Sequence, residues 1–189
     1  MVFTGSTRVG TRVMAGAAAQ IKRVTLELGG KSANIIFDDC DLERAAATAP
    51  YGVFDNAGQD CCARSRILVQ RNVYDRFMEL LEPAVKGVVV GDPTVRTTEM
   101  GPLVSRPHWE SVSAYVPDDA PVAFRGSAPA GAGYWFAPTV LTPERTHRTV
   151  TEEIFGPVVT VLPFEDEADA IALANATSYG LSGSIWTDN

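Results

Sequence analysis

The chain has 189 residues, of which 46% are hydrophobic and 21% are charged, and its formal net charge is −7. This composition excludes a disordered or fibrous chain, and the excess of acidic residues argues against nucleic acid or an anionic membrane as the partner, since such surfaces are met by clusters of Lys and Arg. The chain has no run of eighteen apolar residues and no basic N-terminal region followed by an apolar stretch, so we expect no membrane span, no signal peptide and a cytoplasmic location.

The first part of the chain predicts a strand, a turn and a helix. Residues 2–4 are a short apolar segment, Gly5 and Ser6 form the turn, and apolar residues then recur at four-residue steps, at Val9, Val13, Ala17 and Ile21. Residues 23–28 alternate between apolar and polar side chains, which predicts a second strand.

The middle of the chain continues this alternation of strands and helices. Residues 33–37 are a continuous apolar run of the buried-strand type, and Asp41 is a suitable N-cap for the helix that follows. We expect Pro50 to kink or restart that helix. A strand at 67–70 and a helix at 74–86 come next.

The last part of the chain begins with a Pro- and Gly-rich region at residues 91–133, where we expect loops around one helix at 107–116. The elements predicted beyond it are strands at 134–141 and 158–164, a helix at 166–176 capped by Asp166, and a strand at 182–187. Strands that alternate with helices in this way predict an α/β fold with a largely parallel sheet.

The three cysteines are Cys40, Cys61 and Cys62, an odd number without a Cys-x-x-Cys spacing, and only two histidines accompany them. This set predicts neither a disulfide framework nor structural zinc, and we expect no metal to be required. A bridge between neighbouring cysteines would strain the backbone, so we expect Cys61 and Cys62 to be free thiols in a reducing compartment.

One of these cysteines lies in a short polar turn that spans residues 56–66, Asn-Ala-Gly-Gln-Asp-Cys-Cys-Ala-Arg-Ser-Arg. A thiolate is the reactive form of cysteine, and nearby positive charge lowers the pKa of a thiol, so the closeness of Arg64 and Arg66 in the sequence gives Cys61 a reason to be reactive. Arg66 itself is expected to be a structural ion-pair partner or a solvated charge. The sequence therefore presents Cys61 as a candidate nucleophile, although an adjacent cysteine pair taken alone is more often structural.

A second segment, Leu-Glu-Leu-Gly-Gly-Lys-Ser at residues 26–32, places Glu27 at the end of a strand, 34 positions before Cys61. Glycines allow the backbone to pack closely around a reacting centre. A single carboxylate here could equally be a solvated strand end. Likewise, Gly5 and Ser6 could be an ordinary tight turn, because their spacing to Gly10 is not the G-x-G-x-x-G fingerprint.

Together these two segments resemble the glutamate and cysteine signature motifs of the aldehyde dehydrogenase superfamily. Segments 3–10 and 152–157 agree with the same family, in the same order, so the resemblance covers essentially the whole chain as an internal piece of the family's sequence. It implies a mostly parallel, three-layer α/β fold, truncated at both ends. Residues 1–28 would be the C-terminal remnant of a Rossmann-like cofactor-binding domain, and 29–189 the thiol-bearing catalytic domain, incomplete at its C-terminus.

The resemblance implies oxidation of a small-molecule aldehyde to a carboxylic acid, with NAD or NADP as hydride acceptor. Cys61 aligns with the family's nucleophile and Glu27 with its general base, whereas Cys62 aligns with a neighbour of variable identity. The cofactor-binding positions implied by the resemblance are Gly5 and Ser6 for the pyrophosphate, Glu153 for the hydroxyls of the nicotinamide ribose and Phe155 for packing against it. Full-length members of the family are expected to be homo-oligomers.

Two other functions remain open. The family's adenosine pocket and oxyanion-hole asparagine lie upstream of this segment, so the chain could be a non-catalytic remnant that folds against a partner through its exposed strand edges. Alternatively, Cys61 and Glu27 could act as an esterase without a cofactor, because forming and hydrolysing a thioester requires no hydride transfer. The sequence does not specify the aldehyde.

Overall fold

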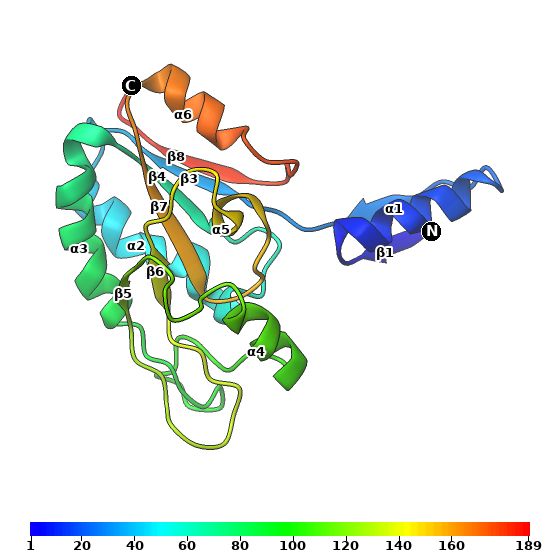
Figure 1. Ribbon diagram of the computed structural model, residues 1–189, viewed down its shortest axis with the longest axis horizontal. Coiled ribbons are helices and arrows are strands. Elements are labelled where there is room, and N and C mark those ends of the chain that lie inside the picture. The colour runs from blue at the N-terminus through cyan, green and yellow to red at the C-terminus, as the bar shows by residue number, and fades with distance from the viewer.

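The computed structural model describes residues 1–189 and contains two sheets of unequal size (Figure 1). In the small sheet, β1 (Val2–Thr4) pairs in parallel with β2 (Thr25–Glu27), and helix α1 (Thr7–Ala18) makes the crossover between them. Figure 1 shows this unit extending away from the rest of the molecule. The predicted strand, turn and helix are therefore confirmed.

The placement of Ile21 on the helix repeat is wrong. Helix α1 ends at Ala18, and Ile21 has a φ of 54° and a side chain that is 95% exposed. The N–H of Lys22 donates to the carbonyl of Ala17 at 3.1 Å, which is the bond that closes a Schellman motif. Ile21 thus occupies the left-handed position that ends the helix, and the chain turns there toward β2.

The large sheet has six strands in the order β5-β6-β7-β4-β3-β8, and all of its neighbours are parallel except β5 and β6. The strands are β3 (Ala33–Ile36), β4 (Arg66–Gln70), β5 (Val122–Arg125), β6 (Thr139–Leu141), β7 (Val158–Phe164) and β8 (Gly183–Trp186). This order confirms the predicted, mostly parallel sheet.

Helices cover both faces of the large sheet, which gives three layers (Figure 1). Helices α2 (Leu42–Phe54) and α3 (Tyr74–Lys86) bury one face, and α5 (Arg148–Thr151) and α6 (Glu167–Ala174) cover the other. Along β4, Ile67 and Val69 join the first core, while Leu68 joins the second. Both faces of the strand are apolar because both are covered. The remaining helical segments are α4 (Arg106–Ser113) and the 3₁₀ turns η1 (Asp55–Gly58) and η2 (Arg71–Val73).

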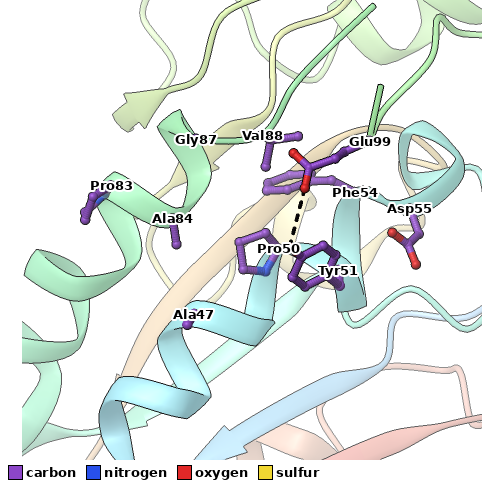
Figure 2. A pocket seen from close by; sticks show the side chains of 10 residues that line it. All are labelled: Ala47, Pro50, Tyr51, Phe54, Asp55, Pro83, Ala84, Gly87, Val88 and Glu99. Carbon is purple, nitrogen blue, oxygen red and sulfur yellow. Dashed lines mark hydrogen bonds between the residues drawn. The ribbon is translucent and has the colours of Figure 1, made fainter. Parts of the chain in front are cut away.

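The predicted caps are confirmed, but Pro50 does not restart its helix. The side chain of Asp41 accepts from the N–H of Arg44, and that of Asp166 accepts from the N–H of Asp169. Helix α2 continues through Pro50 to Phe54, and Figure 2 shows Pro50 on the side of α2 that faces the end of α3. Packing of α2 against α3 thus outweighs the loss of one backbone hydrogen bond.

The segment before β6 corrects two expectations. Strand β5 forms in the region where loops were expected, and it pairs with β6. The predicted strand 134–141 is reduced to Thr139–Leu141, because Pro138 precedes it and the indole N–H of Trp135 donates to the carbonyl of Ala132 in a local turn. A proline offers no N–H to a neighbouring strand.

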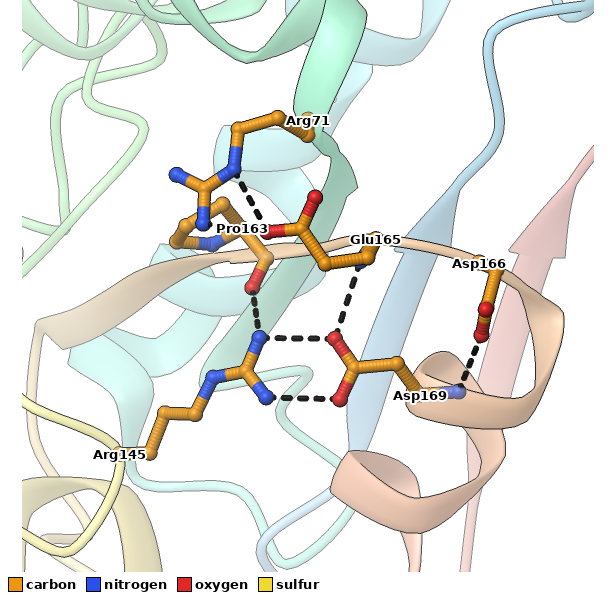
Figure 3. Close-up of polar contacts among 6 residues, drawn as sticks. All are labelled: Arg71, Arg145, Pro163, Glu165, Asp166 and Asp169. Atoms are coloured by element: carbon orange, nitrogen blue, oxygen red, sulfur yellow. Dashed lines mark hydrogen bonds and ion pairs between the residues drawn. The ribbon is translucent and has the colours of Figure 1, made fainter.

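A network of ion pairs joins the end of β7 to α6 and to the end of β4 (Figure 3). Arg145 binds both carboxylate oxygens of Asp169, at 2.7 and 2.8 Å, and donates to the carbonyl of Pro163. These hydrogen bonds lower the pKa of Asp169. Asp169 also accepts from the N–H of Glu165, whose own carboxylate pairs with Arg71 at 2.7 Å.

None of the helices combines the length and the apolar character that crossing a membrane requires.

Candidate active site

A cleft of about 440 Å³ lies between the small sheet and the large one. It is lined by the turn after β1, the end of β2, the cysteine loop and the segment before β7. Its lining residues are Thr4, Gly5, Ser6, Glu27, Leu28, Gly29, Gln59, Asp60, Cys61, Glu153 and Phe155. All six residues that the sequence singled out for catalysis or cofactor binding therefore meet in one cleft, while their chemical roles stay predictions.

The small sheet brings Glu27 and the Gly5 turn together. Thr4 and Glu27 are partners in the parallel register of β1 and β2, and the N–H of Gly5 donates to the carbonyl of Glu27 at 3.0 Å. Both residues thus lie at the carboxyl ends of their strands, where ligands bind in open parallel sheets. The side chain of Glu27 is exposed to the cleft.

Helix α1 begins at this same edge and leaves its first turn open to a ligand. Ser6 is the N-cap, but its hydroxyl makes no capping bond, and no acidic side chain lies in the first turn. The N-terminus of a helix presents free N–H groups and a partial positive charge, which suits an anionic group such as a phosphate. The residues at this end of the cleft therefore fit a pyrophosphate.

The cysteine loop is held in an uncommon backbone conformation. Asn56, Ala57 and Gly58 have successive φ values of 51°, 55° and 67°, in the left-handed region. The amide of Asn56 donates to the carbonyl of Gln59, and the amide of Gln59 donates back to the carbonyl of Asn56. Such strained segments persist where the surrounding structure fixes them, and they cluster at functional sites. Here the loop presents Cys61 half-buried in the cleft.

The glycine pair after Glu27 allows three motifs to touch. A Cβ atom on Gly30 would lie 2.5 Å from the carbonyl oxygen of Cys61, and one on Gly29 would overlap the carboxylate of Glu153. The N–H of Gly30 donates to Oε1 of Glu153 at 3.0 Å. Close packing at these two glycines therefore sets the distance between the glutamate motif, the cysteine loop and the segment before β7.

Phe155 also has a left-handed backbone, with a φ of 57°, and His108 holds it in place. Nε2 of His108 donates to the carbonyl of Phe155 at 2.7 Å, and the two rings meet edge to face with centroids 5.9 Å apart. No sequence signal points to this role, because His108 is an isolated histidine in a helix that belongs to none of the four motifs.

The expected activation of Cys61 by arginine is wrong. Burial raises the pKa of the Cys61 thiol, and contact with the Cys62 thiol and the nearby charge of Asp60 raise it further. Arg66 is buried and donates to the carbonyls of Lys31, Leu173 and Ala174, and Arg64 packs over Gly52 of α2. Arg66 is therefore occupied by backbone carbonyls and Arg64 by its packing on α2, and neither contributes to the pKa shift of the thiol.

Lys31, the residue after the glycine pair, carries a buried amino group without a partner. Its side chain is 1% exposed, and Nζ makes no hydrogen bond. Burial, followed by the nearby charge of Arg66, lowers the pKa of Lys31 to about 7, against a smaller opposing effect of Glu153 and Glu152. An ammonium group in such a place is destabilising, because desolvation favours the neutral amine.

Comparison with known proteins agrees with this geometry. The model of the aldehyde dehydrogenase family matches residues 1–189. Among similar sequences, an aldehyde dehydrogenase of Emericella nidulans is 44% identical over 100% of this chain and 39% of its own length, and the putative aldehyde dehydrogenase DhaS of Bacillus subtilis is 41% identical over the same shares.

Solved structures agree as well. A betaine aldehyde dehydrogenase of Staphylococcus aureus in complex with NAD+ superimposes with a TM-score of 0.93 at 42% identity, covering 100% of this chain and 39% of that one. The E194S mutant of an aldehyde dehydrogenase from Bacillus cereus gives a TM-score of 0.94 at 44% identity, with the same coverage. The chain thus spans about 39% of the length of the relatives it matches, and it belongs to the aldehyde dehydrogenase family.

Proposed function

We propose that this chain carries the catalytic residues of an NAD(P)-dependent aldehyde dehydrogenase, with Cys61 as the nucleophile and Glu27 as the general base. The observation that supports the proposal is that a thiol from the loop after η1 and a carboxylate from the end of β2 line one cleft. The relatives are aldehyde dehydrogenases, and one of the similar structures holds NAD+.

The first step is addition of Cys61 to the aldehyde. Burial raises the pKa of this thiol, so its proton must pass to solvent water before the sulfur attacks the carbonyl carbon. The product is a tetrahedral thiohemiacetal. Its oxyanion can accept from the N–H of Cys61, which donates to no protein atom, whereas the N–H of Cys62 is committed to Asp60 at 3.0 Å.

The other four cleft residues fit a dinucleotide. The Gly5 turn and Ser6 offer the open N-terminus of α1 to the pyrophosphate. Glu153 uses Oε1 to accept from Gly30, which leaves Oε2 for the ribose hydroxyls, and the ring of Phe155 packs beside them. The chemistry that NAD or NADP supplies when bound is acceptance of the hydride.

Cys61 then holds the acyl group as a thioester, and Glu27 completes the cycle. Its exposed carboxylate takes a proton from a water molecule, and that water attacks the thioester carbonyl to release the acid and the thiol. In the same proposal, residues 1–28 are the cofactor-binding part and 29–189 the catalytic domain, with the boundary between the two sheets.

The test is formation of NADH or NADPH by the purified chain with a panel of aldehydes. We expect turnover that Cys61→Ala lowers by at least about 10⁴-fold, because removal of a catalytic nucleophile leaves only binding and oxyanion contacts. Cys40→Ser is the matched control, since Cys40 packs against the α2 and α3 core, away from the cleft. Equal turnover by Cys61→Ala and the parent chain would refute the proposal.

A second candidate function is an esterase, because the reaction of an ester with Cys61 and Glu27 does not involve the residues assigned to the cofactor. Cys61 and Glu27 can act on an activated ester without any of the contacts assigned to the dinucleotide. Hydrolysis of p-nitrophenyl acetate that needs Cys61 but no NAD, together with no NADH formation, would favour an esterase. Absence of both activities would favour a non-catalytic remnant.

A further inference from the structure

Beside the cleft lies a cluster of three potential metal ligands, Asp60, Cys61 and Cys62, of which Asp60 and Cys61 line the cleft itself. The thiols of Cys61 and Cys62 lie 3.9 Å apart, and one carboxylate oxygen of Asp60 is within 4.8 Å of both. In the proposed reaction only Cys61 has a role. Cys62 and Asp60 therefore call for a separate explanation.

The separation of the two sulfur atoms matches that of two ligands on one metal ion. Zinc–thiolate bonds are about 2.3 Å long, and two such bonds at the tetrahedral angle place the sulfur atoms about 3.8 Å apart. The observed distance is 3.9 Å. Neither side chain has to move far for both to bind the same ion.

The backbone also orients the third ligand. Oδ1 of Asp60 accepts from the N–H of Cys62 at 3.0 Å, which fixes the carboxylate beside the two thiols. A cation is favoured here because the guanidinium groups of Arg64 and Arg66 are directed away, Arg64 over Gly52 and Arg66 into buried carbonyls. No positive side chain lines the cleft.

We propose that Asp60, Cys61 and Cys62 form a binding site for a thiophilic divalent cation such as Zn²⁺ or Cd²⁺, with two sulfur ligands, one oxygen ligand and a fourth position open to water. As the two metal–sulfur bonds form, the two thiol protons pass to the buffer. The bound ion occupies the sulfur of Cys61, so it blocks reactions of that thiol. Only this inhibitory consequence depends on the proposed function, because binding needs neither aldehyde nor cofactor.

The experiment is a titration of the purified chain with Cd²⁺ under a reductant that contains no thiol, followed by the ultraviolet charge-transfer absorption of cadmium–thiolate bonds. We expect saturation at one equivalent. Cys62→Ala and Asp60→Asn should each weaken binding by at least about tenfold, since loss of even an outer-shell partner costs about 10- to 100-fold. Cys40→Ala, which changes a half-buried thiol in the core beside α2, should leave the titration unchanged.

A second readout is alkylation of Cys61 by iodoacetamide, located by peptide mass spectrometry. Cd²⁺ should protect Cys61 in the parent chain and in Cys40→Ala, and it should protect poorly in Cys62→Ala. Circular dichroism checks that each variant is folded. Saturation without a thiolate band, equal affinity of Cys62→Ala and the parent chain, or loss of binding in Cys40→Ala would each overturn the site. A chain that binds Cd²⁺ in this way but forms no NADH would keep the metal site and refute the proposed function.

Discussion

The two sides of the cleft differ in how firmly they are built. On the thiol side, β4 and β7 are buried on both faces under helices, and a continuous core supports the cysteine loop. On the other side, β1 and β2 form a two-stranded sheet, and α1 buries only Gly10 and Ala17. Cys61 is thus held by a rigid body, whereas Glu27 and the Gly5 turn belong to a lightly supported unit.

The small unit is expected to be only marginally stable on its own. An isolated pair of strands is marginally stable in water, because it cannot bury enough apolar surface to offset the entropy of ordering the chain. Val2, Met14 and Ile21 remain exposed in the small unit. A ligand that bridges the cleft would contact both sides and stabilise the small unit by mass action.

Hydrogen exchange measures how easily each of the two sheets opens. Amides of β1 and β2 should exchange about 10³-fold faster than those of β4 and β7, since local opening of a small unit requires less free energy than global unfolding and every 1.4 kcal/mol is tenfold. Mass spectrometry of peptides from both sheets gives the rates. Equal protection in the two sheets would show that the small unit is as firmly held as the body.

Gly30→Ala tests the close packing between the glutamate motif on one side of the cleft and the cysteine loop on the other. A Cβ at Gly30 would meet the backbone of Cys61 at 2.5 Å, so we expect about a 10²-fold loss of activity from misplacement of the cysteine loop. The free energy of unfolding should fall by about 1–3 kcal/mol. Gly16→Ala is the matched control, because a Cβ there meets no atom within 4 Å in helix α1, and it should stabilise the chain by up to about 1 kcal/mol. Activity of Gly30→Ala equal to that of the control would contradict the close packing.

Lys31→Met tests the buried amine behind the cleft. Because the pKa of Lys31 is about 7 in the folded chain and 10.5 in the unfolded one, the unfolded state binds the extra proton between these values. The stability of the parent chain should therefore rise across this window, by up to about 1.4 kcal/mol per pH unit from this group. Its burial cost is fully present below pH 7.

Lys31→Met should remove that contribution, so the free energy of unfolding of the variant should exceed that of the parent chain by the largest amount at and below pH 7. The gain should vanish as the pH approaches 10.5. Urea unfolding across this range checks the difference, with Lys86→Met, an exposed partner of Glu82, as the control. A gain that does not depend on pH would count against a buried, unpaired Lys31.

The smallest effect is expected for His108→Phe. This change keeps a ring beside Phe155 but removes the hydrogen bond to its carbonyl, so unfolding should become easier by about 1 kcal/mol. We expect a severalfold higher KM for the cofactor with little change in kcat, because the bond positions Phe155 and does not touch the substrate. Steady-state kinetics would contradict this account if kcat alone fell.

Much of this arrangement could be predicted from the sequence. Buried strands were recognisable by continuous apolar runs such as residues 33–37, helix starts by Asp41 and Asp166, and the candidate site by four ordered motifs. These signals are local, or they depend on the spacing of motifs along the chain. They are therefore visible without knowledge of tertiary contacts.

The expectations that the structure corrected, and the role of His108 that was missed, depend on contacts between distant segments. Arg66 is adjacent to the cysteine loop in sequence, yet its guanidinium binds carbonyls that lie more than 100 positions away, at Leu173 and Ala174. The role of His108 depends on Phe155, which is 47 positions later. Strand β5 forms because β6 is available to pair with it. Local charge and propensity do not contain this information.

In the proposed reaction Cys61 takes up an acyl group, and Glu27 activates the water that removes it. The most direct measurement is mass spectrometry of the parent chain and of Glu27→Gln after mixing with p-nitrophenyl acetate, together with the rate of nitrophenol release. We predict one acetyl group trapped on Cys61 in Glu27→Gln, with steady turnover lowered by about 10²- to 10⁴-fold, since general base catalysis contributes that much. Unchanged turnover in Glu27→Gln, or an acetyl group on a residue other than Cys61, would contradict the account.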